Sequence, residues 1–234
     1  MRSPEDVKSD LIQLIRESQA VSPQLANRLD EMRRWIAQKK SGLLMRKRYV
    51  MQLLEELIAD ASVWLSLQQL SQEDKKTELA GLSTPERYWY RDLFPAWFNE
   101  KDPKLHIWKK NLMAGNFQGN DAAFINKICL GLENGGCETL NPFIADLSMA
   151  TDLIASGTQK SPLCVQVTSV RDNLSTDKQV QWQETLEHWG IVRGLFISFN
   201  PSQVQVNAKV TLIIQLNSDL LPEQCYLKAS VDNL

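Results

Sequence analysis

Three oxygen-bearing side chains fall on two neighbouring segments in the second half of the chain. Asp152 belongs to the segment 151–155 (TDLIA), and Gln166 and Thr168 belong to the segment 163–169 (LCVQVTS). Because side chains alternate along a strand, Gln166 and Thr168 share one face, and Asp152 on the adjacent strand of a hairpin can lie beside Gln166. Oxygen ligands suit a hard cation such as Mg²⁺, which polarises a phosphodiester and activates an attacking water. We therefore expect Asp152 and Gln166 to be candidate metal ligands.

A block of basic residues in the first half of the chain is the second chemical feature. Between Glu31 and Glu55 there is no acidic residue. The seven basic residues of this interval, here called the basic block, are Arg33, Arg34, Lys39, Lys40, Arg46, Lys47 and Arg48. Such a block can contact phosphates and release counterions from a nucleic acid. A solvated helical tip is the alternative interpretation.

Charged residues are distributed unevenly between the two halves of the chain. The 234 residues have a net charge of −2, but residues 1–110 carry 19 basic and 16 acidic side chains, whereas residues 111–234 carry 7 and 12. Apolar residues make up 43% and charged residues 23%, which is ordinary for a globular protein and excludes bulk disorder. The nearly neutral total therefore does not exclude an anionic partner.

Cysteine and histidine usage excludes several other classes of site. There are four scattered cysteines without a CxxC pair and only two histidines, so neither a zinc cage nor a Ser-His-Asp triad is expected. Scattered cysteines are typical of reduced thiols, and we expect a cytoplasmic protein. The N-terminal sequence MRSPEDVKSD is too charged for a signal peptide, and no apolar run approaches the roughly 20 residues of a membrane span.

The first half of the chain has the periodicity of helices. Apolar residues recur at helical spacing in three segments, which open near Pro4, Pro23 and Val50. Ser41-Gly42 separates the second from the third, so we expect an antiparallel helical hairpin with the basic block at its tip. The long third helix has more apolar face than one hairpin partner covers, which favours a homodimer or another protein partner.

An aromatic stretch occupies residues 88–108. Pro85, Pro95 and Pro103 interrupt it, so it cannot form one long helix. We expect its rings to pack the helical part onto the second half of the chain, and a base-stacking surface is the alternative.

The second half of the chain alternates helical and strand-like segments. The sequence predicts a helix that ends at Gly135-Gly136, strands within 137–156, and a strand at 163–168. A capping box at Thr176 opens another helix, and strands follow at 195–199 and 206–216. This order predicts an α/β sandwich with helices over a mixed sheet. We expect a helical region over 1–115 and an α/β domain over 116–234.

The order of these segments over 116–216 resembles the PD-(D/E)xK nuclease superfamily, which has the restriction-endonuclease-like fold. In that superfamily an Asp on one strand precedes an (E/Q)-x-K triplet on the next. Asp152 matches the Asp, Gln166 matches the acidic position, and Thr168 stands where the Lys is expected. The resemblance implies a Mg²⁺-dependent hydrolase of nucleic acid. It also implies that Lys178, at the opening of the next helix, replaces the missing lysine, with Arg171 and Lys160 as alternatives.

Three functions are compatible with these features. The first is a nuclease, with DNA the favoured substrate, that uses Asp152, Gln166, Thr168 and Lys178 for catalysis and the basic block for binding. The second is a catalytically silent member of the same fold that binds nucleic acid or protein, because sites can be lost while scaffolds persist. The third is a protein adaptor that uses the aromatic stretch as its interface.

Overall fold

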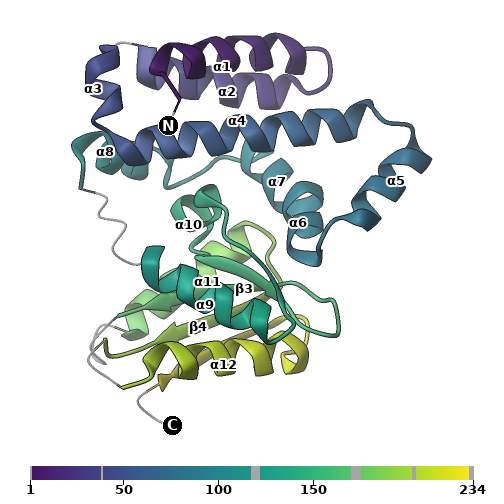
Figure 1. Ribbon diagram of the computed structural model, residues 1–234, viewed down its shortest axis with the longest axis vertical. Helices are drawn as coiled ribbons and strands as arrows, with labels where there is room; N and C mark the ends of the chain where they lie inside the picture. Colours follow the sequence, from purple (N-terminus) through teal and green to yellow (C-terminus); the bar gives the residue numbers. More distant parts are fainter. Residues whose placement is uncertain (1, 38, 117–121, 170–174, 202–203, 232–234) are drawn as a thin grey trace. The chain divides into compact units, whose positions relative to one another are not determined.

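The computed structural model describes residues 2–37, 39–116, 122–169, 175–201 and 204–231 (Figure 1). Contacts divide the chain into two compact units. The helical unit comprises Met1–Leu82 and Trp89–Gln118, and the α/β unit comprises Ser83–Tyr88 and Gly119–Leu234. The predicted boundary lies after residue 115, and no sequence pattern indicated that residues 83–88 belong with the second unit. No described helix is both long and apolar enough to cross a membrane.

The described residues of the helical unit form only helices. These are α1 (Pro4–Ser18), α2 (Pro23–Ala37), α3 (Ser41–Met45), α4 (Arg48–Gln69), α5 (Gln72–Gly81), the π-helical turn η1 (Trp89–Leu93), α7 (Phe94–Asn99) and α8 (Leu105–Ala114). The predicted start of the first helix is confirmed, because the Ser3 side chain accepts a hydrogen bond from the Asp6 N–H and Pro4 occupies the first turn.

The predicted hairpin of the second and third helices is wrong. Residues 41–45 do not form a tight connection but a short helix, α3, whose Leu44 is buried. Helix α1 packs against both α2 and α4 (Figure 1). Helix α2 also packs against α7. The apolar side chain of Leu44 explains the difference, because burying it requires the connection to fold back onto the bundle.

The aromatic stretch forms part of the core of the helical unit. Trp89, Phe94 and Trp97 are almost completely buried, so a base-stacking surface on these rings is ruled out. Helical structure continues from η1 into α7 although Pro95 lies there. Pro95 occupies the first turn of α7, where the N–H that proline lacks would have no partner within that helix. The helix then ends at Asn99, before Pro103, as expected for a stretch that is not one long helix.

The α/β unit contains five helices and five strands in its described residues. They are α6 (Thr84–Tyr88), α9 (Ala122–Asn134), β1 (Glu138–Leu140), α10 (Phe143–Met149), β2 (Leu153–Ser156), β3 (Leu163–Thr168), α11 (Ser175–His188), β4 (Arg193–Ser198), α12 (Val206–Leu220) and β5 (Cys225–Ser230). The sheet has the order β1-β2-β3-β4-β5. Strands β1, β2 and β3 pair in antiparallel fashion, and β3, β4 and β5 pair in parallel. The predicted α/β class with a mixed sheet is confirmed.

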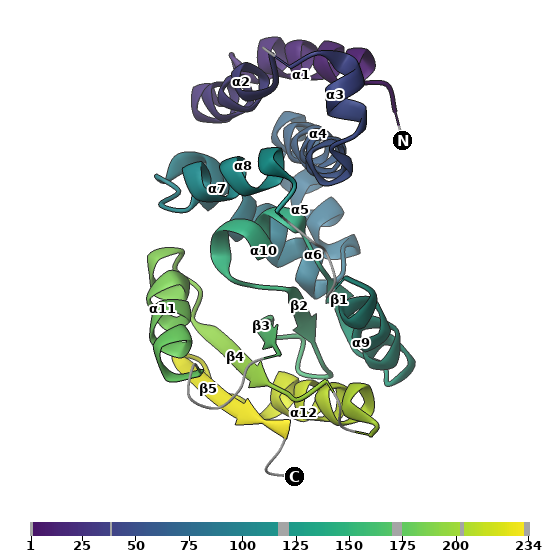
Figure 2. The ribbon, with the colours of Figure 1, turned by 90° about the vertical axis from the view of Figure 1, so that its left-hand side faces the viewer.

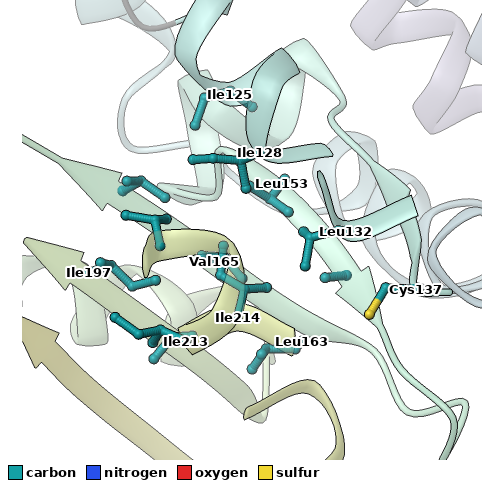
Figure 3. Packing of buried hydrophobic residues seen from close by; sticks show 14 of the residues in the cluster. Ile125, Ile128, Leu132, Cys137, Leu153, Leu163, Val165, Ile197, Ile213 and Ile214 are labelled. Atoms are coloured by element: carbon teal, nitrogen blue, oxygen red, sulfur yellow. The ribbon is translucent and has the colours of Figure 1, made fainter. Parts of the chain in front are cut away.

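Helices cover both faces of this sheet (Figure 2). On one face, apolar side chains of α9 and α12, among them Ile128 and Ile214, pack on Val165 of β3 (Figure 3). On the other face, the Trp182 ring of α11 lies 5.5 Å from the Phe196 ring of β4. Gly194 permits this approach, because a Cβ there would lie 2.4 Å from a Leu186 methyl carbon.

Two predicted strand assignments are wrong. Residues 206–216, rich in β-branched side chains, belong to helix α12, and residues 143–149 within the predicted strand region form helix α10. In α12 the buried apolar side chains are Val210, Ile213 and Ile214, a spacing that suits a helix on a sheet, so tertiary packing overrides β-propensity. The last strand, β5, was not predicted.

The predicted capping box at Thr176 concerns a side chain outside the described part of the structure. The backbone of helix α11 is described from Ser175 onward.

Candidate functional site

The structure brings Asp152 and Gln166 together at the start of β2. The Gln166 Nε2 donates a hydrogen bond to Asp152 Oδ2 at 2.8 Å, and the Val167 backbone N–H donates to the same oxygen at 2.6 Å. The Asp152 backbone N–H donates to the Val165 carbonyl at 2.8 Å. Strand alternation and the antiparallel pairing of β2 with β3 produce this geometry.

These contacts bind Asp152 to protein donors. An N–H group that donates to a carboxylate oxygen stabilises the negative charge, and it also competes with a cation for that oxygen. Gln166 faces Asp152 with its amide nitrogen. The contact between Asp152 and Gln166 therefore links the start of β2 to β3.

Two further acids of the α/β unit lie on other elements. Asp146 belongs to helix α10, in a segment for which a strand was predicted. Glu138 on β1 is in register with Ser156, at the opposite end of β2 from Asp152. Among the residues that the structure describes, no three His, Cys, Asp or Glu side chains are grouped to hold a metal. Mg²⁺ prefers several oxygen ligands, and Asp152 is the carboxylate at the start of β2 that the sequence analysis assigned to it.

Of the three candidates for the missing lysine, Lys160 is the one whose side chain the structure describes. Thr168 is in register with Ser198 on β4, which in turn is in register with Ser230 on β5, so hydroxyl-bearing residues lie at the end of the parallel strands. Lys178 lies in the first turn of α11, and its side chain is outside the described part of the structure, as is all of Arg171.

Lys160 has a different partner. Its Nζ lies 2.5 Å from Glu138 Oε1, while Glu138 Oε2 accepts hydrogen bonds from the Thr84 N–H and the Ser156 hydroxyl. The Lys160 ammonium group, together with these hydrogen bonds, lowers the pKa of Glu138 to about 2. This ion pair lies where α6 and β1 meet and is structural.

Four residues of the basic block have identifiable neighbours. Arg33 and Arg34 both pair with Asp30, at 2.7 and 3.0 Å, and the Arg48 guanidinium lies 5.9 Å from the Tyr49 ring centre. Lys47 Nζ approaches Gly115, at the C-terminal end of α8, where the helix dipole favours a positive charge. Several of its side chains therefore have local structural partners.

A basic groove in the helical unit contains part of this block. The groove has a volume of about 1220 Å³ and lies between α2, the segment 98–102 and α8. Its six basic residues are Arg28, Arg34, Lys39, Lys101, Lys109 and Lys110. Its three acidic residues are Glu31, Glu100 and Asp102, so its charge is positive.

Two of the three acids are engaged by neighbours, Glu31 by two cations and Asp102 by uncharged N–H donors. Glu31 pairs with Arg28 at 3.2 Å and with Lys109 at 3.1 Å. Asp102 is buried and accepts hydrogen bonds from the Trp108 Nε1–H and the Lys104 N–H. Lys39 and Lys110 are exposed on the lining, as are Lys101, Arg34 and the third acid, Glu100.

Sequence reasoning missed the contribution of α8 to this groove. Lys109 and Lys110 are about 70 residues from Lys39 and do not form a basic run. The packing of the Trp35 ring against the Trp108 ring, with centres 5.9 Å apart, joins α2 to α8. The only signal in the sequence was that each of these two segments contains a tryptophan. That signal does not show that the two tryptophans contact each other.

In comparisons with known protein families, characterised proteins and solved structures, none matches this chain. The function must therefore be inferred from the geometry of the two candidate sites.

Proposed function

We propose that this protein binds nucleic acid, with DNA favoured, through the basic groove of the helical unit. The observation that carries the proposal is the concentration of six Lys and Arg side chains from separate segments around one groove. Cations gathered along a concave surface neutralise successive phosphates and release their counterions, which provides affinity independent of sequence.

We further propose that the α/β unit is a catalytically silent relative of the PD-(D/E)xK nucleases. Its order of helix α9, strand β1, the β2–β3 pair, helix α11 and strand β4 supports that fold, as does the position of Asp152 beside Gln166. The engagement of Asp152 by two N–H donors, together with the threonine at position 168, supports the loss of catalysis.

The environment of the cysteines supports a location in the cytoplasm. All four cysteines are free thiols, and Cys137 and Cys164 are buried. Unpaired thiols persist in a reducing compartment.

The binding proposal predicts a salt-dependent affinity that two groove lysines control. The double variant Lys39→Gln and Lys110→Gln should weaken DNA binding about tenfold and reduce the slope of log affinity against log salt by about one to two. Fluorescence anisotropy with labelled DNA over a salt series measures both quantities. The matched control replaces Lys76 and Lys127, which are exposed and lie outside the groove, and should leave both unchanged. Equal losses in the two double variants would refute the groove as the binding site.

A nuclease is the second candidate function, and the contact between Asp152 and Gln166 is the observation that favours it. With supercoiled plasmid and Mg²⁺ or Mn²⁺, we expect no nicking by the unmodified protein. The nuclease would be established, and the silent site overturned, if the protein nicked the plasmid and Asp152→Ala abolished the nicking without loss of DNA binding. The exposed-site control Glu223→Ala should then still nick the plasmid. Calorimetry with Mn²⁺ alone provides an independent measurement of metal binding.

A further inference from the structure

We infer that the basic groove binds a single strand of nucleic acid in preference to a duplex, with the Trp35 ring as a stacking surface for one base. The inference rests on the proposed function and specifies the class of its ligand.

The shape of the charged surface favours a single strand. Proteins read a duplex by inserting a protruding helix or β-ribbon into a groove of the nucleic acid. Here the cations line a hollow of the helical unit, and Lys39 and Lys110 lie on its lining. A flexible single strand can follow a concave path with its phosphates toward the cations.

The environment of Trp35 suits a stacking role. Trp35 lines the groove and is partly exposed, unlike the buried Trp97, Phe98 and Trp108 of the same unit. Its ring meets the Trp108 ring edge to face, at an interplanar angle of 85°. Trp108 is fixed in turn by the hydrogen bond from its Nε1–H to Asp102, at 3.1 Å. Trp35 is therefore a supported aromatic ring at the edge of a cationic groove.

The combination of ring and cations specifies the ligand further. A base of any identity has a π-face, so an aromatic ring beside phosphate-binding cations recognises single strands with little sequence preference. Arg34 directly precedes Trp35 on α2, and Lys39 lies four residues after it, just beyond the end of that helix. Lys110 on α8 borders the same groove, so both elements that line it contribute charge near the ring.

The test compares a labelled oligo-dT single strand of about 15 nucleotides with a duplex of the same length, by fluorescence anisotropy at fixed salt. We expect the single strand to bind about tenfold more tightly than the duplex. Trp35→Leu, which keeps an apolar contact with Trp108, should weaken single-strand binding about tenfold and leave duplex binding and the salt slope unchanged. Trp35→Phe keeps an aromatic ring, so its single-strand affinity should lie between those of the unmodified protein and Trp35→Leu. The phenylalanine variant also provides the test if the leucine variant fails to fold.

The matched control is Ile107→Ala, an exposed apolar residue of α8 that does not line the groove. It should bind the single strand like the unmodified protein. Equal affinity for single strand and duplex, or unchanged single-strand binding by both Trp35 variants, would overturn this inference while leaving the proposed function intact. Absence of binding to either DNA and to a matched RNA strand would overturn both.

Discussion

At the scale of single residues, the helical unit contains a buried carboxylate that neither candidate site uses. Asp60 lies on α4 with 7% of its surface exposed, and the Tyr90 hydroxyl donates a hydrogen bond to its Oδ1 at 3.1 Å. Burial raises the pKa of Asp60 to about 6, while the hydrogen bond from Tyr90 opposes that rise. The ionised form therefore destabilises the folded state.

This environment predicts a pH-dependent stability. Because the folded-state pKa is above that of an unfolded Asp, this group adds stability as the pH falls from about 7 to 4, and its ionisation costs up to about 3 kcal/mol at higher pH. Asp60→Asn should increase the free energy of unfolding at pH 7.5 by about 1–3 kcal/mol, and the gain should disappear near pH 4. Urea denaturation at the two pH values measures it. Glu78→Gln, an exposed acid of α5, is the control, and equal behaviour of the two variants would contradict the role of burial.

At the scale of elements, Arg193 of β4 joins the sheet to the end of helix α12. Its side chain is buried and donates hydrogen bonds to the carbonyls of Leu221 at 2.9 Å, Ser218 at 3.0 Å and Pro162 at 3.2 Å. The last carbonyls of a helix have no partner within the helix, and a cation there also suits the helix dipole. Arg193 thus caps the C-terminal end of α12 and fixes its position on the sheet.

Loss of this guanidinium should destabilise the α/β unit. Arg193→Met keeps much of the side-chain volume but leaves buried carbonyls without donors, so we expect a loss of about 3 kcal/mol in the free energy of unfolding. Thermal and urea denaturation followed by circular dichroism measure this change. Lys127→Met, on the exposed surface of α9, should change stability by less than about 0.5 kcal/mol. A loss no larger than that of the control would contradict the assigned role.

Residue patterns predicted some elements better than others. Helices α1 and α9 were predictable because a capping serine or a pair of glycines accompanies their apolar periodicity. The helix over residues 206–216 was not predictable, because β-branched side chains favour a strand locally. The packing of α12 on the sheet stabilises the helix instead. The contact between Asp152 and Gln166 was predictable from strand alternation alone. The position of Lys110 in the groove was not, because it depends on the packing of two helices that are distant in the sequence.

At the scale of the whole molecule, the distribution of charge along the sequence does not by itself locate a site. The excess of basic residues in the first half includes part of the basic groove. In the second half, Glu138 is engaged by Lys160, and Asp152 is engaged by backbone and amide donors. Composition cannot show these local partners of the acids.

The assignment of helix α6 to the α/β unit determines how the chain can be divided. The polypeptide passes from one unit to the other three times, after Leu82, after Tyr88 and after Gln118. A fragment that begins at residue 116 would lack α6, and Glu138 would lose its hydrogen bond from the Thr84 N–H. A single proteolytic cut or a simple truncation therefore cannot separate the two units intact. An independent α/β fragment would need residues 83–88 joined to its N-terminus by a new linker.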